Sequence, residues 1–110
     1  MSETLQRIDE MVKTYPVVLF MKGSPQFPMC GFSSRTVETL KGYEQPFAWC
    51  NVISDQAVRA ELPSYQDWPT FPQLYVEGEL VGGCDIVMEL AESGELEGMI
   101  KSAAEKFPAE

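Results

Sequence analysis

The apolar run from Pro16 to Met21 constrains the fold more than any other segment of this 110-residue chain. It shows no alternation of apolar and polar side chains. Such a run is typical of a strand that is buried on both faces, in a parallel or central position of a sheet. Upstream of it, apolar residues recur at helical spacing and predict a helix before the strand: Leu5, Ile8, Met11 or Val12, and Tyr15.

A helix and a second strand are predicted after this run. Residues 23–29 break the apolar pattern and predict a loop. A helix is then predicted from about Phe32 to Lys41, with Gly42 as the residue that ends it. Phe47 to Val52 predicts the next strand. Strand, helix and strand therefore form one β-α-β unit.

The next segment predicts a capped helix and then an irregular stretch. Asp55 is placed to cap a helix that presents Val58, Leu62 and Tyr65 on one face. The stretch from Pro63 to Pro72 is rich in proline, which removes helical hydrogen bonds. We therefore expect no long helix there.

A hairpin and two helices are predicted to complete the chain. Gln73 to Val76 and Glu79 to Val81 flank Glu77-Gly78, a short turn with glycine that predicts antiparallel strands. Apolar residues at helical spacing predict two helices with a break at Ser93-Gly94: Ile86, Val87 and Leu90, then Leu96, Ile100, Ala103 and Phe107. This order of elements resembles a thioredoxin-like α/β/α sandwich with a four-stranded mixed sheet. We expect one domain over residues 1–110.

The composition limits the classes of function. Eight Lys and Arg against seventeen Asp and Glu give a formal net charge of −9 at pH 7, which disfavours nucleic acid and anionic membranes as partners. No apolar run is long enough for a membrane span, and Met1 to Arg7 lack the pattern of an export signal. We therefore expect a soluble cytoplasmic protein. Its three cysteines predict reactive or ligating thiols, and the absence of histidine excludes Cys-His and Ser-His nucleophile pairs.

The candidate reactive residue is Cys30, in the segment Cys30-Gly31-Phe32-Ser33 at the start of a predicted helix. A helix start offers free backbone N–H groups and the positive end of the helix dipole, and both favour a thiolate. Lys22, close in sequence, acts in the same direction. Ser33 stands where a Cys-x-x-Cys redox site carries its resolving thiol. The site therefore needs a second sulfur from another molecule.

Four segments, in order, carry a family resemblance: Lys22-Gly23-Ser24-Pro25, Cys30-Gly31-Phe32-Ser33, Trp68-Pro69-Thr70-Phe71-Pro72-Gln73 and Gly82-Gly83-Cys84-Asp85. Together they resemble the monothiol glutaredoxins of the Cys-Gly-Phe-Ser class, over nearly the whole chain. The resemblance implies a thioredoxin-like fold, a site for glutathione and a role in iron binding. It also implies that Cys30 ligates iron and forms mixed disulfides with glutathione.

The resemblance implies one half of the glutathione site in the segment Thr70-Phe71-Pro72. The matching proline of the family follows a cis peptide bond. That bond turns the backbone N–H and C=O of Phe71 toward the reactive thiol. An extended tripeptide would pair with this backbone as a short strand does. The ends of the tripeptide must then supply the specificity.

The resemblance implies that the two ends of glutathione meet opposite charges. Gly83 and Cys84 begin another helix, where backbone groups would bind the γ-glutamyl carboxylate and the Asp85 carboxylate would meet the ammonium group. Lys22 and Arg59 stand at the family's positions for binding the glycine carboxylate.

For several other residues the sequence leaves the role open or favours a part in packing over a part in binding. Cys84 either contributes only its backbone N–H, which we favour, or forms a disulfide with Cys30, or fills space. Cys50 is interpreted as a packed core thiol, and Trp49 and Trp68 as core or rim residues. The family usually has an acidic residue where Asn51 stands, which bears on local packing or partner preference.

A [2Fe-2S] cluster takes four thiolates, and one copy of the chain offers one good ligand. The resemblance implies that two copies of Cys30 and two glutathiones hold the cluster in a homodimer, which is a monomer without it. Such a protein would deliver clusters to apo iron-sulfur acceptor proteins and pair with BolA-type proteins. The alternatives are a glutathione-dependent oxidoreductase that reduces protein-glutathione mixed disulfides and an inert thioredoxin-like interaction module.

Overall fold

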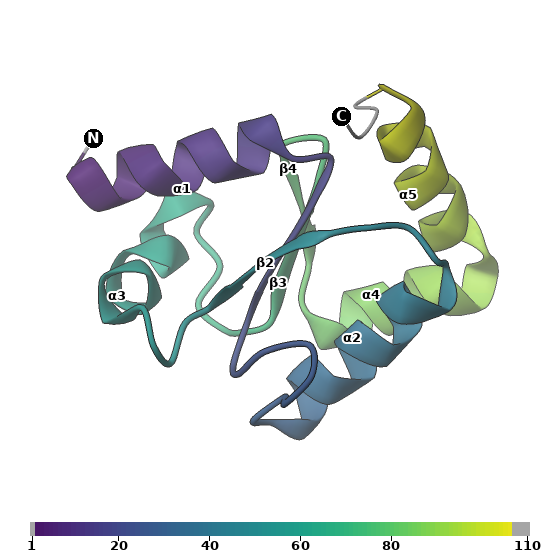
Figure 1. Cartoon of the computed structure of the whole chain (residues 1–110), viewed down its shortest axis with the longest axis horizontal. Helices are drawn as coiled ribbons and strands as arrows, with labels where there is room; N and C mark the ends of the chain where they lie inside the picture. The colour runs from purple at the N-terminus through teal and green to yellow at the C-terminus, as the bar shows by residue number, and fades with distance from the viewer. Residues whose placement is uncertain (1, 107–110) are drawn as a thin grey trace.

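The computed structural model describes residues 2–106. It shows a four-stranded sheet with helices on both faces (Figure 1). In chain order the elements are α1 (Glu3–Thr14), β1 (Val17–Met21), α2 (Gly31–Gly42), β2 (Ala48–Asn51), α3 (Gln56–Tyr65), β3 (Gln73–Val76), β4 (Glu79–Gly82), α4 (Cys84–Ser93) and α5 (Glu95–Lys106).

The sheet is mixed, with strand order β2-β1-β3-β4. β1 runs parallel to β2 and antiparallel to β3, and β3 and β4 form an antiparallel hairpin. All five residues of β1 are buried, as expected for a strand with a neighbour on each side and helices on both faces. The predicted central strand, β-α-β unit and hairpin are therefore confirmed.

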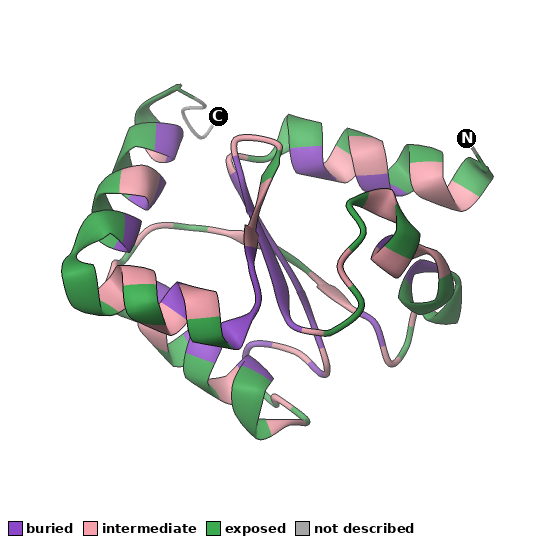
Figure 2. Ribbon diagram, turned by 180° about the vertical axis from the view of Figure 1, so that it is seen from behind, coloured by how far each residue is buried: buried purple, intermediate pink, exposed green. Residues whose placement is uncertain are grey.

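The side chains of β1 alternate between two hydrophobic clusters. Leu19 and its same-face neighbours pack with residues of α2, α4 and α5, whereas Phe20 packs with residues of α1 and α3. Figure 2 shows the buried residues along the strands and on the inward sides of the helices. Each fully buried large apolar side chain contributes on the order of 1.5–3 kcal/mol. This arrangement is the predicted thioredoxin-like α/β/α sandwich.

Local sequence signals explain where several elements begin and end. The Asp55 side chain accepts a hydrogen bond from the Val58 N–H at 3.2 Å and caps α3, as predicted. Glu77 and Gly78 have φ angles of 54° and 81°, the left-handed backbone that a tight hairpin turn requires. Gly94, at φ 83°, separates α4 from α5.

Some predicted boundaries were wrong. Tyr15 lies just beyond α1 and is exposed, because the residue before a proline is disfavoured in the helical conformation. Gly42 is the last residue of α2, as predicted, and Tyr43 follows as the cap. Pro63 lies inside the last turn of α3, where a proline removes only one late hydrogen bond. Phe107, predicted to belong to the last helix, lies outside the described residues.

Of the two interpretations of Trp49, core or rim, the structure shows the rim. This side chain is 42% exposed, because β2 is the edge strand beside β1 and one of its faces meets solvent at that point. None of the helices within residues 2–106 combines the length and apolar character that crossing a bilayer requires.

Candidate functional site

Cys30 is the N-cap residue of α2, directly after the loop that follows β1. Its Sγ atom lies 3.3 Å from the backbone nitrogen of Ser33 and 3.4 Å from the Ser33 hydroxyl oxygen. The Ser33 N–H donates to the sulfur, as a capping bond at a helix start does. The predicted position of the thiol at a helix N-terminus is confirmed.

Ser33 is fully buried, and its hydroxyl joins two parts of the site. Its Oγ accepts a hydrogen bond from the Lys22 backbone N–H at 3.1 Å. That bond occupies a lone pair of the oxygen and leaves the hydroxyl proton available to the Cys30 sulfur. Ser33 therefore does not only lack a resolving thiol. Its hydroxyl can also donate a hydrogen bond to the Cys30 thiolate.

These contacts lower the pKa of Cys30. Partial burial raises the pKa of this thiol, but the Ser33 hydroxyl, the backbone N–H groups of Ser33 and Phe32, and the charge of Lys22 together outweigh burial. Each of these groups stabilises the thiolate more than the thiol. The thiol next to the loop is thus prepared to act as a nucleophile or as a metal ligand.

The loop between β1 and α2 is closed by its own hydrogen bonds. The Met29 N–H donates to the Lys22 carbonyl at 2.8 Å, and Ser24 and Phe27 exchange backbone bonds. Lys41 of α2 adds a bond from its Nζ to the Pro25 carbonyl at 3.1 Å. The loop therefore holds a defined shape against α2.

A cleft of about 830 Å³ opens beside this loop, and it brings together residues from across the chain. Seven of the predicted glutathione residues line it: Lys22, Arg59, Thr70, Phe71, Gly83, Cys84 and Asp85. Phe32, Pro63, Trp68, Pro69 and Ile86 complete the lining. Cys30 and Pro72 are not lining residues. Phe32, two residues after Cys30 in the first turn of α2, is a lining residue. The Pro72 carbonyl oxygen lies 3.3 Å from where a Cβ on Gly83 would stand.

Residues 68–72 form one wall of the cleft, and within it the backbone groups of Phe71 are unpaired among the described residues. The peptide bond between Phe71 and Pro72 is cis, as the resemblance implied. The Phe71 N–H and C=O form no hydrogen bond within the described residues. Buried Gln73 braces this wall, because its Nε2 donates to the Trp68 carbonyl at 2.8 Å and to the Thr70 carbonyl at 3.2 Å.

The opposite wall is the start of α4. Gly83 is its N-cap and provides no side-chain capping bond, so the first backbone N–H groups of the helix lack a side-chain acceptor. An added Cβ on Gly83 would lie 3.4 Å from the Trp68 indole nitrogen, so glycine permits the close contact of the two walls. Asp85 is exposed and lines the cleft. This wall offers donors for an anion beside one carboxylate for a cation.

Lys22 and Arg59, the two cations of the cleft, form no ion pair within residues 2–106. Among the described residues, Arg7, Lys13, Lys101 and Lys106 each pair with a carboxylate. Neither Lys22 nor Arg59 pairs with a described carboxylate, although the chain carries an excess of acidic residues. Two unpaired cations on one cleft favour an anionic ligand.

Residues 17–81, more than half of the chain, match the family model described as Glutaredoxin. The chain belongs to the glutaredoxin family. Because Ser33 replaces a second active-site cysteine, it is a monothiol glutaredoxin.

Relatives of this glutaredoxin match it over nearly its full length. The chain is 49% identical to Glutaredoxin 4 of Pasteurella multocida over 108 residues, which cover 98% of this chain and 99% of that relative. Reduced poplar apo GrxS14 is 46% identical with a TM-score of 0.77, covering 89% of this chain and 90% of the poplar chain. A buckwheat glutaredoxin-glutathione complex is 26% identical with a TM-score of 0.81, covering 92% and 90%.

The other two cysteines differ from Cys30. All three are free thiols. Cys84 is buried at the first position of α4 and lines the cleft. Cys50 is half-buried instead of fully packed, and burial raises its pKa to about 11, with smaller and opposing effects from Asp55 and Arg7. Within residues 2–106, no three Cys, Asp or Glu side chains come together as a metal site.

Sequence reasoning missed three supporting roles. The hydroxyl of Ser33 touches the sulfur, the Gln73 amide braces the cis-proline wall, and the Asn51 side chain ties the loop after β1 to β2. A serine three residues after a capping cysteine was the signal for the first role, since that spacing brings the third residue to the cap. No sequence signal identified the other two, because their partners are distant or irregular backbone.

Proposed function

We propose that this glutaredoxin binds glutathione in the cleft and carries a [2Fe-2S] cluster shared between two copies of the chain, for iron-sulfur cluster assembly and transfer. The observation that carries the proposal is a single activated thiol, Cys30, next to a cleft with anion-binding groups. Within one copy, no other set of ligands accompanies that thiol among the described residues. The remaining ligands must therefore come from other molecules.

The chemistry of the cleft supports glutathione as the ligand. Glutathione has a carboxylate at each end and an ammonium group at one of them. The start of α4 with Asp85 suits the γ-glutamyl end, and Lys22 with Arg59 suits the glycine carboxylate. The free N–H and C=O of Phe71 suit its extended backbone. The buckwheat relative with bound glutathione has the same fold.

The ligand count supports sharing of the cluster. A [2Fe-2S] cluster takes four thiolates, and two copies of Cys30 with two glutathione thiols make four. A dimer held through such a cargo would separate into monomers when the cluster leaves. Exchangeable glutathione ligands would favour transfer to apo acceptor proteins, and a BolA-type protein is a further proposed partner. Three free thiols suit a reducing compartment such as the cytoplasm.

The lowered pKa of Cys30 also favours a second candidate, a glutathione-dependent oxidoreductase. The Cys30 thiolate would attack the glutathione sulfur of a protein-glutathione disulfide and release the protein as its thiolate. A second glutathione thiolate would attack the new Cys30-glutathione disulfide. Its products are oxidised glutathione and the regenerated Cys30 thiolate, so one free glutathione is consumed and the other half of the oxidised glutathione comes from the mixed disulfide.

The two candidates are separated by anaerobic reconstitution with iron and sulfide, with and without glutathione. Ultraviolet-visible absorption and the mass in solution are measured on the chain and on Cys30→Ser. We expect a coloured dimer only with glutathione and Cys30 present. A colourless monomer that reduces a glutathione mixed disulfide at a catalytic rate would replace the cluster carrier by the oxidoreductase.

The glutathione assignment is tested with charge-removing variants. We expect Lys22→Gln and Arg59→Gln each to weaken glutathione binding by about threefold to tenfold, as removal of one charge-assisted bond does. Lys101→Gln is the matched control, because it removes the same charge from a residue paired with Glu97 on α5. Calorimetric titration gives the affinities, and equal weakening by all three variants would contradict a specific carboxylate site.

A further inference from the structure

The two unpaired cations of the cleft come from different loops. Lys22 directly follows β1, and Arg59 lies in the first turns of α3, which follows β2. β1 and β2 are parallel, with Met21 opposite Asn51, so both loops begin at the carboxyl ends of neighbouring strands, on the same side of the sheet's end. The spacing between the two cations therefore depends on how these loops are joined.

Asn51, the last residue of β2, joins them through one side-chain oxygen. Its Oδ1 accepts a hydrogen bond from the Gly23 N–H at 3.0 Å, in the loop after β1. The same atom accepts from the Ile53 N–H at 2.9 Å, in the turn before α3. One carboxamide oxygen thus bonds both loops at once.

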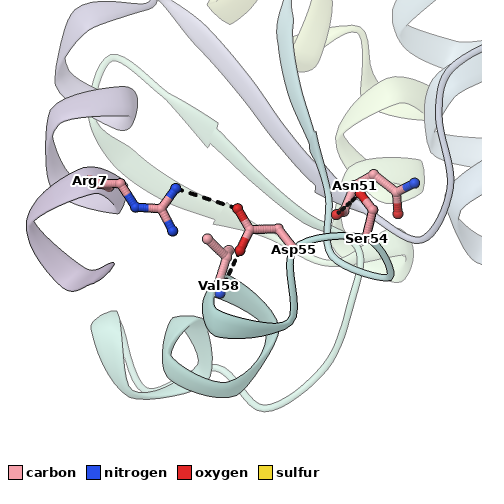
Figure 3. Close-up of polar contacts among 5 residues, drawn as sticks. All are labelled: Arg7, Asn51, Ser54, Asp55 and Val58. Atoms are coloured by element: carbon pink, nitrogen blue, oxygen red, sulfur yellow. Dashed lines mark hydrogen bonds and ion pairs between the residues drawn. The ribbon is translucent and has the colours of Figure 1, made fainter. Parts of the chain in front are cut away.

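The Asn51 backbone extends the connection to α3. Its carbonyl accepts from the Asp55 N–H at 3.0 Å and from the Ser54 hydroxyl at 3.1 Å. Figure 3 shows the Ser54 contact beside Asp55, whose side chain caps α3 at Val58. The Asp55 carbonyl in turn accepts from the Arg59 N–H at 3.0 Å. Asn51 is therefore connected to the backbone of Arg59 through one residue.

The loop on the other side has little freedom to compensate. Gly23 has a φ of 96°, and a Cβ there would lie 2.4 Å from the Phe27 carbonyl oxygen and 2.7 Å from the Met29 nitrogen. Gly23 is thus packed tightly within its own loop, and the bond to Asn51 fixes that packed corner to β2. Lys22 precedes this corner, and its N–H is held by Ser33.

We propose that Asn51 is a positioning residue that sets the spacing of Lys22 and Arg59 and so makes the cleft select a ligand that ends in a carboxylate. The inference rests on the proposed glutathione function. In this role Asn51 affects which ligand binds through the positions of Lys22 and Arg59, and it does not touch the ligand itself.

The decisive variant is Asn51→Ser. A serine hydroxyl reaches the N–H two residues ahead in its own turn, which retains the Ile53 bond, but it is too short for Gly23. Asn51→Asp keeps an acceptor for both N–H groups and serves as the conservative variant. Ser54→Ala is the matched control, because it removes a bond within the same turn and leaves Gly23 bound.

Binding is measured with two probes, glutathione and its glycine-esterified form, which lacks the glycine carboxylate. We expect Asn51→Ser to weaken glutathione binding about tenfold, as loss of a part-buried hydrogen bond does, and to change ester binding by less than about twofold. We expect Asn51→Asp and Ser54→Ala to keep the preference for glutathione over the ester. Hydrogen exchange of the Gly23 amide should quicken only in Asn51→Ser.

The outcomes distinguish this inference from the proposed function. If the unmodified chain binds neither probe, the glutathione function fails. If it prefers glutathione and Asn51→Ser keeps that preference although the Gly23 amide exchanges faster, the positioning role of Asn51 is overturned. Equal weakening toward both probes would reduce Asn51 to a residue that supports the fold.

Discussion

Cys30 and Cys50 are both half-buried thiols close to the sheet edge where β1 and β2 end, yet their pKa values move in opposite directions. In each case partial burial raises the pKa. At Cys30 the Ser33 hydroxyl, two backbone N–H groups and Lys22 outweigh that effect. At Cys50 no hydrogen-bond donor opposes it within the described range, and Asp55 adds to it.

The difference shows what converts a cysteine into a reactive group. Partial burial does not, because it raises the pKa of both thiols. The position at a helix start does, since the free N–H groups there point at the sulfur. In a strand such as β2 the backbone N–H groups lie in the plane of the sheet, whereas the cysteine side chain stands out of that plane and receives no such donors.

The largest expected effect is a difference in alkylation rate between the two thiols. Near neutral pH, iodoacetamide should modify Cys30 at least about tenfold faster than Cys50, because Cys30 has far more thiolate even after its lower nucleophilicity is counted. Mass spectrometry of peptides over time gives both rates. Comparable rates for the two residues would contradict the opposite pKa shifts, and Cys30→Ser confirms which modification is fast.

The next effect concerns the donor that distinguishes the two sites. Ser33→Ala removes a fully buried hydroxyl, leaves the Lys22 N–H without its acceptor and takes a donor from the Cys30 thiolate. We expect a loss of about 1–3 kcal/mol in the free energy of unfolding and a rise in the Cys30 pKa. Urea unfolding and the pH dependence of thiolate absorbance measure the two quantities.

The matched control for Ser33→Ala is Ser34→Ala, the next residue along α2, whose hydroxyl has no contact with Cys30. This variant should leave the Cys30 pKa unchanged. If Ser33→Ala lowers stability without raising the Cys30 pKa, the hydroxyl supports only the packing of the loop. The comparison between Cys30 and Cys50 would then rest on backbone donors and Lys22.

The general fold was predictable because its signals are local. The apolar run ending at Met21, the capping aspartate Asp55 and the turn glycine Gly78 each act on neighbouring residues, and the structure confirms all three. Whether a strand is central or at the edge is a property of the whole sheet. For that reason the interpretation of Cys50 on β2 as a packed core thiol was wrong, and the interpretation of Trp49 stayed open between core and rim.

In the candidate site too, some features could be predicted from the sequence and others depend on the folded chain. The thiol at a helix start follows from its own sequence neighbourhood, whereas Lys22, Arg59 and Asp85 were assigned to one site only through the family resemblance. The contacts that hold these residues in place do not follow from sequence. Gln73 reaches carbonyls of irregular backbone, and Asn51 reaches an N–H 28 positions away. Each depends on a packing that exists only in the folded chain.

The contributions of Cys30 and Cys50 to the free energy of unfolding should change in opposite directions as pH rises. Cys30 has a lowered folded pKa, so its stabilising contribution is present above the unfolded thiol pKa of about 8.5 and is lost as pH falls through the folded value. Cys50 has a folded pKa raised to about 11. Its contribution is present below about pH 8.5 and is lost as pH rises toward the folded value.

Urea unfolding across this range tests the signs, with Cys30→Ser and Cys50→Ser compared with the unmodified chain. The stability advantage of the unmodified chain over Cys30→Ser should grow as pH rises toward about 8.5. Its advantage over Cys50→Ser should shrink as pH rises beyond that value. Parallel slopes for the two variants would contradict the assigned directions.

The smallest expected effect tests how much charge, as opposed to burial, contributes at Cys50. Asp55 raises the Cys50 pKa and Arg7 lowers it, and the two side chains form an exposed ion pair at 3.5 Å (Figure 3). Asp55→Asn keeps the cap on α3, so we expect it to cost only about 0.5 kcal/mol of stability and to speed Cys50 alkylation slightly. Asp55→Ala also loses the cap and should cost about 1 kcal/mol more. Arg7→Gln should slow Cys50 alkylation slightly, because it leaves the carboxylate unopposed.

If burial is the main cause of the raised Cys50 pKa, both charge variants leave the alkylation of Cys50 far slower than that of Cys30. If Asp55→Asn instead makes Cys50 react about as fast as Cys30, the Asp55 carboxylate, and not burial, is the main cause of the raised Cys50 pKa.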